Sequence, residues 1–202
     1  MIIGLVGLIG SGKGAAGDYL ETRGFIKESF AKPLKDAAAI IFNWPRHLLE
    51  GDTEESRVWR EKVDSYWTSK LDWIVTPRII LQKLGTESGR NVFGESVWTA
   101  SLINRLDPTK NYAITDVRFA NEIDALRSAG AKIVQIQRGD LPEWVIPAKR
   151  YLEVCPKNTE FHFGGEIIHI SEYGWVNSTM DYLIHNDGTL ERLYYNLDMI
   201  ID

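Results

Sequence analysis

A glycine-rich loop near the start of the chain constrains the fold more than any other feature. Its residues, Gly7-Leu8-Ile9-Gly10-Ser11-Gly12-Lys13, match the first seven positions of the pattern G-x-x-x-x-G-K-[ST]. A short β-branched run, Ile2–Val6, precedes the loop, and Lys13–Arg23 has the apolar spacing of a helix. Glycines let backbone N–H groups surround phosphates, while the lysine and the helix N-terminus add positive charge. The segment therefore predicts a phosphate-binding loop between a buried strand and a helix.

One position departs from this pattern. Gly14 stands where Ser or Thr usually provides a hydroxyl ligand for magnesium. Ser11 lies inside the loop and need not replace that ligand. Two interpretations follow: either the metal is held through waters and other groups, or phosphoryl transfer has been lost and the chain is a nucleotide-dependent switch. We favour the first.

The remaining chain alternates strand-like and helical segments, which predicts a parallel sheet with crossover helices on both faces. The expected strands are Phe25–Phe30, Asn111–Val117, Lys132–Gln137 and Asp181–His185, and the expected helices are Ala120–Ala129 and Leu190–Met199. Two segments interrupt this alternation. Residues 36–106 are mostly helical and carry five Trp, and residues 139–178 are rich in Pro, Gly and aromatics without clear periodicity.

Long excursions from a small sheet are often lids or binding loops. We therefore expect one domain over residues 1–202. Its core would comprise residues 1–35, 107–138 and 179–202, with a helical acceptor-binding insertion at 36–106 and a lid region at 139–178. Exposed Trp side chains in the insertion would suit a homodimer interface as well as a core, so the oligomeric state stays open.

Composition narrows the class of protein. A hydrophobic fraction of 44% fits a globule with a real core. The net charge of -5 argues against a non-specific nucleic-acid binder, which needs a dense Lys/Arg surface. The single cysteine, Cys155, excludes an intrachain disulfide, and no segment approaches the ~20 apolar residues of a membrane span. We expect a cytoplasmic protein with neither nucleic acid nor membrane as partner.

Four further blocks of sequence carry a family resemblance through their order and spacing. They are Phe30–Asp36; Arg78–Gln82 with Gly85–Glu87 and Arg90; Thr115–Phe119 with Asn121 and Glu122; and Asn186–Glu191. With the glycine loop, the chain resembles the deoxynucleoside monophosphate kinases of tailed bacteriophages, relatives of adenylate kinase and dephospho-coenzyme A kinase. Members of that family often lack the hydroxyl residue after the lysine. The resemblance implies an α/β fold, namely a P-loop NTPase three-layer α/β/α sandwich with a parallel five-stranded sheet.

The resemblance also implies an activity: ATP phosphorylates a deoxynucleoside monophosphate (dNMP) in the presence of Mg²⁺, in the host cytoplasm if the gene is a phage's. ATP would be bound by Gly10, Ser11, Gly12, Lys13 and Gly14, and by Asn186, Asp187 and Gly188 against the adenine. Alternatives are a kinase for another small acceptor, such as dephospho-coenzyme A or a nucleoside, and the inactive switch.

The acceptor site would draw on the second and third blocks. Arg78 and Gln82 are four residues apart on one polar stripe of a helix, where arginine suits a phosphate and the amide suits a base edge. Without the resemblance, the stripe is an ordinary solvated helix face. Arg90 is a second phosphate ligand or a helix-end charge, and Lys35 is an acceptor contact or part of a solvated helix start. By resemblance to adenylate kinases, Arg118 would grip the acceptor phosphate.

The catalytic set would be Lys13, Asp116, Arg138 and Arg150. Asp116 would hold magnesium through water or activate the acceptor oxygen; the alternative is a turn-capping aspartate. Arg138, Lys149 and Arg150 are candidates for lid cations that neutralise the transferring phosphoryl group, and the two arginines are preferred. The four histidines lack metal-ligand spacing, so no structural zinc is expected.

Overall fold

In the structure, a computed structural model that describes residues 1–155 and 160–202, the first apolar run forms the central strand of a parallel sheet. The strand order is β2-β3-β1-β4-β7, and every neighbouring pair is parallel. The strands are β1 (Ile2–Val6), β2 (Ile26–Glu28), β3 (Tyr112–Ile114), β4 (Lys132–Gln137) and β7 (Tyr182–His185). Because the strands are parallel, the loops after β1, β3, β4 and β7 all emerge at one edge of the sheet.

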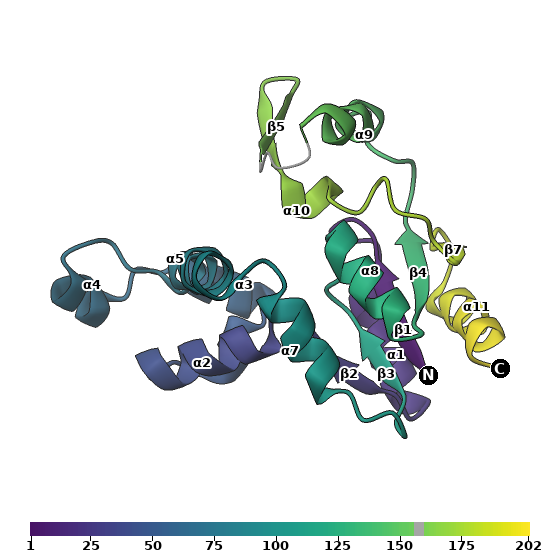
Figure 1. Ribbon diagram of the computed structural model, residues 1–202, viewed down its shortest axis with the longest axis horizontal. Helices are drawn as coiled ribbons and strands as arrows, with labels where there is room; N and C mark the ends of the chain where they lie inside the picture. Colours follow the sequence, from purple (N-terminus) through teal and green to yellow (C-terminus); the bar gives the residue numbers. More distant parts are fainter. Residues whose placement is uncertain (156–159) are drawn as a thin grey trace. The chain divides into compact units, whose positions relative to one another are not determined.

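Helices cover both faces of this sheet (Figure 1). On one face α1 (Lys13–Thr22) and α11 (Leu190–Ile201) close a hydrophobic core over β1, β3, β4 and β7. On the other face α8 (Ala120–Ser128) packs so closely that a Cβ at Gly4 would lie 2.9 Å from Leu126 Cδ1. Ile3 and Gly4 point to opposite faces because side chains alternate along a strand. The expected three-layer α/β/α sandwich with five parallel strands is confirmed.

The chain divides into two compact units, Met1–Ser29 with Ile103–Asp202, and Phe30–Leu102. The second unit is helical and contains α2 (Lys32–Phe42), the 3₁₀ helix η1 (Arg46–Leu49), α3 (Glu54–Glu61), α4 (Ser65–Leu71), α5 (Pro77–Gln82), the π-helix η2 (Lys83–Arg90), α6 (Asn91–Phe93) and most of α7 (Val97–Arg105). Residues 36–106 were the expected insertion, and its role in acceptor binding stays a prediction. No helix in the described part of the chain is long and apolar enough to cross a membrane.

Tryptophans build the core of the helical unit. Trp44 is 8% exposed and stacks on Phe42 with ring centroids 4.6 Å apart. Trp59, Trp67 and Trp73 pack against the same buried cluster. These large aromatic side chains bury much apolar area each, which gives a unit of short helices its own core. Four of the five tryptophans of this unit therefore contribute to a core, and a homodimer interface stays a prediction.

The segment 139–178 is more regular than its sequence indicates. It contains α9 (Val145–Val154), a hairpin of β5 (Glu160–Phe163) and β6 (Glu166–His169), and α10 (Ile170–Tyr173). The two-residue turn Gly164–Gly165 has positive φ at both positions, as a tight hairpin turn requires. The expectation of a segment without regular structure was wrong, because Gly164–Gly165 allows a tight turn that joins two short strands.

The charged stretch after Thr53 forms two short helices, because α3 ends at Glu61 and Asp64 caps the separate helix α4 by accepting from the Trp67 N–H. One other expectation needs correction. Strand β3 is shorter than predicted and ends at Ile114. Asp116 and Arg118 therefore lie in the loop beyond the strand rather than on it.

Candidate active site

The glycine loop wraps the C-terminal end of β1 and leads directly into α1. Gly12 precedes the helix with φ 106°, a conformation that L side chains rarely adopt. A Cβ there would also overlap Asn186 Nδ2, and a Cβ at Gly7 would overlap the carbonyl oxygen of Ile136. Gly12 at the N-cap position has no side chain to cap the first N–H groups of α1. These groups and the helix dipole form an anion-binding site at the edge of the sheet.

Lys13 folds back over this loop. Its Nζ donates to the carbonyl oxygens of Gly7 and Leu8 at 2.6 and 2.7 Å. Burial, with the charge of Arg118 as the next contribution, lowers the pKa of Lys13 from 10.5 to about 8, and the Glu172 carboxylate opposes that shift. The ammonium is therefore poorly solvated and gains from an anion placed beside it.

The loop after β7 is tied to the phosphate loop. Asn186 Nδ2 donates to the Ser11 carbonyl oxygen at 2.9 Å, and Asp187 Oδ1 accepts from the Gly139 N–H at 2.5 Å. Gly188 follows in the same exposed turn. Residues 186–188 thus brace the phosphate loop and the start of the 139–178 segment. Their expected contact with adenine stays a prediction.

The hydroxyl missing at Gly14 is not supplied by Ser11. The Ser11 Oγ faces Gly7 at the base of the loop, where it is buried and has no hydrogen-bond partner among the described residues. Gly14 is exposed, and a Cβ built there meets nothing within 4 Å. The described residues contain no cluster of three or more His, Cys, Asp or Glu that could hold a metal.

Arg118 is held in place by a buried carboxylate that was not expected to act in the site. Glu122 is 4% exposed, and its Oε2 accepts from the Arg118 and Phe119 N–H groups at 2.8 and 3.2 Å. The Arg118 guanidinium reaches Glu172 on α10, with Nη1 3.5 Å from Oε1. Lys13, Arg118 and Glu172 therefore form one charge cluster, and half-buried Asp116 lies in the same loop as Arg118. Glu172 lies outside the four sequence blocks that carry the family resemblance, so the sequence did not point to it.

The candidate lid cations differ in position. Arg138 directly follows β4 and lines a cavity of about 220 Å³ whose other walls include the phosphate loop from Gly7 to Ser11 and the side chain of Trp175. Arg150 is exposed on α9, and Lys149 lies beside it. Among the described residues that line this cavity, Arg138 is present and Arg150 is not. The structure thus brings one of the two preferred arginines to the loop.

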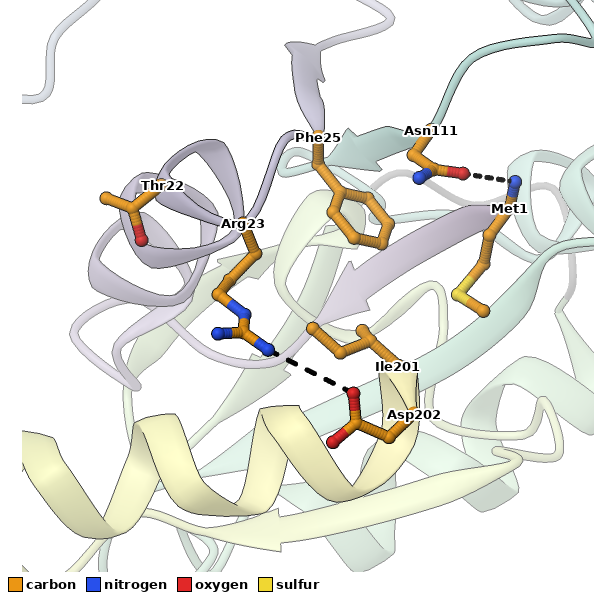
Figure 2. Close-up of a pocket in the computed structure, with 7 residues that line it drawn as sticks. All are labelled: Met1, Thr22, Arg23, Phe25, Asn111, Ile201 and Asp202. Atoms are coloured by element: carbon orange, nitrogen blue, oxygen red, sulfur yellow. Dashed lines mark hydrogen bonds and ion pairs between the residues drawn. The ribbon is translucent and has the colours of Figure 1, made fainter.

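A second cavity, of about 370 Å³, lies at the opposite edge of the sheet (Figure 2). Met1 and the ends of α1 and α11 line it, and the Met1 ammonium donates to Asn111 Oδ1 at 2.7 Å. The side chains of Arg23 and Asp202 point toward each other across it (Figure 2). Because ligands of parallel α/β sheets bind at the carboxyl ends of strands, this larger cavity is not the active site.

The expected acceptor residues, apart from Arg118, lie in the helical unit. Arg78 and Gln82 are both exposed on α5, where Arg78 Nε forms an ion pair with Glu61. Lys35 is only 14% exposed, and its Nζ lies 2.6 Å from Glu50 Oε2. Arg90 is the half-buried last residue of η2. Their roles at a substrate stay predictions.

Comparison with known proteins shows which family the chain belongs to. A family model for deoxynucleotide monophosphate kinase matches residues 52–144. A putative deoxynucleotide monophosphate kinase of Acanthamoeba polyphaga mimivirus is 34% identical over 68% of this chain and 74% of its own length. The deoxynucleotide monophosphate kinase of Escherichia phage RB69 is 27% identical to this chain. The match covers 61% of this chain and 44% of that protein.

Dephospho-CoA kinase from Campylobacter jejuni is among the similar solved structures, with 16% identity, a TM-score of 0.47 and coverage of 99% of this chain and 95% of that one. That score is too low to carry an argument, so the fold rests on the sheet and the phosphate loop themselves. A lysine-bearing phosphate loop at the carboxyl edge of a parallel α/β sheet, in a chain that matches a nucleotide kinase family, identifies a P-loop nucleotide kinase. The chain belongs to the deoxynucleotide monophosphate kinase family.

Proposed function

We propose that the chain transfers the γ-phosphoryl group of ATP to a dNMP. An oxygen of the acceptor phosphate forms a bond to the γ-phosphorus, the bond to the β,γ-bridging oxygen breaks, and ADP and a dNDP leave. The observation that carries this proposal is that two cations, Lys13 of the phosphate loop and Arg118, act on each other by charge at this site. The chain that holds them belongs to the deoxynucleotide monophosphate kinase family. Such transfers depend mostly on positioning and on charge stabilisation.

On the donor side, the loop N–H groups from Gly10 to Gly14 and the Lys13 ammonium would bind the ATP phosphates. Residues 186–188 would border the adenine, since they already brace this loop. Arg138 and Arg150 would neutralise charge on the transferring group. Arg138 has the stronger claim because it lines the cavity beside the loop.

Magnesium fits this site if waters and substrate phosphates supply most of its ligands and the protein supplies few. The ion commonly keeps several waters and uses one or two carboxylates with substrate phosphates, and Asp116 offers one carboxylate in the loop with Arg118. Asp116 would hold the ion through water, with open space at Gly14 for that hydration. When bound, the ion neutralises charge on the β- and γ-phosphate oxygens.

On the acceptor side, Arg118, Arg78, Arg90 and Lys35 would supply cations for the dNMP phosphate, and Gln82 would contact the base. Glutamine suits the base because its amide both donates and accepts hydrogen bonds. Both substrates belong to the cytoplasmic nucleotide pool, so the cytoplasm, of the host for a phage gene, is the proposed place of action.

The test is an assay of ADP release with Mg²⁺ and each of the four dNMPs, with AMP and no acceptor as controls. We expect ADP release to depend on at least one dNMP and to exceed the rate with AMP. The Asp116→Asn variant should still bind ATP but turn over roughly 10²-fold more slowly. ADP release that no dNMP stimulates would reject the proposal, and normal turnover of Asp116→Asn would reject the magnesium role.

A further inference from the structure

Glu172 is fixed close to the phosphate loop by its neighbours in the chain. It lies on α10, whose last residue, Tyr173, is fully buried. A Cβ at Gly174 would lie 3.1 Å from the Arg118 carbonyl oxygen and 3.0 Å from Phe119 Cδ1, so the backbones approach closely. Trp175 Nε1 donates to the Glu172 carbonyl oxygen at 3.0 Å. The α10 backbone is therefore anchored against the loop that carries Arg118.

The Glu172 carboxylate contacts Arg118 and acts electrostatically on Lys13, and both cations are expected to bind phosphate. Its Oε1 lies 3.5 Å from Arg118 Nη1, and it acts on Lys13 with the opposite sign to Arg118. A charge-assisted N–H···O bond is normally about 2.7–2.9 Å long, so the contact with Arg118 is loose. The Glu172 side chain is 28% exposed, so solvent reaches it although its backbone is anchored.

We infer that Glu172 competes with a nucleotide phosphate for Arg118 and Lys13, and so sets how tightly nucleotides bind. The inference rests on the proposed function. A phosphate carries more charge than a carboxylate and can accept two bonds from the guanidinium, whereas Glu172 makes one loose contact, so phosphate displaces Glu172. Nucleotide binding must then overcome the attraction between Glu172 and the two cations. When the nucleotide leaves, Glu172 interacts with these cations again. The residue thereby weakens both substrate and product binding.

The experiment compares the wild-type protein with Glu172→Gln, which keeps the shape and removes the charge. Kd values for ATP and for each dNMP are measured by calorimetry, together with Tm at zero and saturating nucleotide. We expect Glu172→Gln to bind at least one of these ligands roughly two- to fivefold more tightly, the scale of one partly exposed ion pair. Its rise in Tm on adding that ligand should also exceed the wild-type rise, because the two measurements are linked.

Glu166→Gln is the matched control. Glu166 is an exposed carboxylate on β6, in the same 139–178 segment, so this variant loses the same charge without touching Arg118. It should bind nucleotides like the wild type. A control that tightens binding equally would assign the effect to net charge and overturn the inference.

Unchanged or weaker affinity in Glu172→Gln would also overturn it, since a residue that positions Arg118 for phosphate would weaken binding when neutralised. If Glu172→Gln fails to fold, Glu172→Asp gives the same comparison. The shorter side chain retreats from Arg118, so tighter binding is again expected, and unchanged or weaker binding rejects the inference. None of these affinities depends on turnover. Absence of dNMP-stimulated ADP release would therefore reject the proposed function separately.

Discussion

At the scale of single residues, Lys13 shows how a loop prepares a cation for an anion. Its half-buried ammonium donates to two carbonyl oxygens of its own loop, and the charge of Arg118 acts on it. The motif in the sequence predicts the lysine but not this environment. Glu122 and Glu172 could not be assigned from the sequence, because their effects arise from contacts with Arg118 across the fold.

The pKa of Lys13, about 8, makes ATP binding depend on pH. Phosphate favours the charged ammonium, so ATP binding should raise this pKa, take up protons near pH 8 and weaken as pH rises through 8. The groups around Lys13 are Arg118, which lowers its pKa, and Glu172, which raises it. Calorimetry at pH 7, 8 and 9 in two buffers of different ionisation enthalpy measures both effects.

Lys13→Arg is the control, because a guanidinium stays charged throughout this range. Its ATP affinity should vary less with pH than that of the wild type.

The stability of the fold follows the same linkage: the unfolded chain binds more protons at this residue between pH 8 and 10.5. The destabilisation due to Lys13 is thus fully present below pH 8 and is relieved as pH rises. An ATP affinity that is flat from pH 7 to 9 would contradict the assignment.

At the scale of elements, the phosphate loop contains glycines with different roles. Gly12→Ala should destabilise the protein by roughly 1–3 kcal/mol, because φ is 106° and the new Cβ overlaps Asn186. Gly14→Ser should be neutral or stabilise by up to about 1 kcal/mol, since its site is open and lies in a helix. Urea unfolding measures both. Equal destabilisation by the two substitutions would show that the loop geometry is misassigned.

Helix α5 carries two residues with distinct expected effects on the acceptor. Arg78→Ala should raise KM for all four dNMPs to a similar extent, because they share one phosphate. Gln82→Ala should change their ranking, because only the base differs. Glu61→Gln is a control for the ion pair, and it should leave the ranking unchanged while freeing Arg78. A common factor for every dNMP in Gln82→Ala would exclude base reading by that residue.

The elements that could be predicted from the sequence are those with a strong local pattern. The strand Lys132–Gln137 has the predicted bounds, and its apolar residues Ile133, Val134 and Ile136 are buried. Strand β3 is shorter than its pattern, because its pairing with β1 covers only Tyr112 to Ile114. The β5–β6 hairpin was missed because its strands are four residues each and only Gly164–Gly165 marks the turn.

At the scale of the whole molecule, each of the two units has a hydrophobic core among the residues that the structure describes. The first spreads over the sheet under α1 and α11, and the second gathers around Trp44 in the helical unit. Burial of Trp44 gives that residue a structural role within one chain. The homodimer therefore stays a prediction, to be decided from the mass of the protein in solution.

The tryptophan cluster also gives the protein uneven optical properties. Five of the seven indoles, at positions 44, 59, 67, 73 and 98, belong to the helical unit. There the rings of Trp44 and Trp59 are held at 89° with centroids 5.9 Å apart. Intrinsic emission and near-ultraviolet circular dichroism should therefore report chiefly on that unit. Trp175 lines the cavity beside the phosphate loop, so the Trp175→Phe variant separates a nucleotide-binding signal from that background.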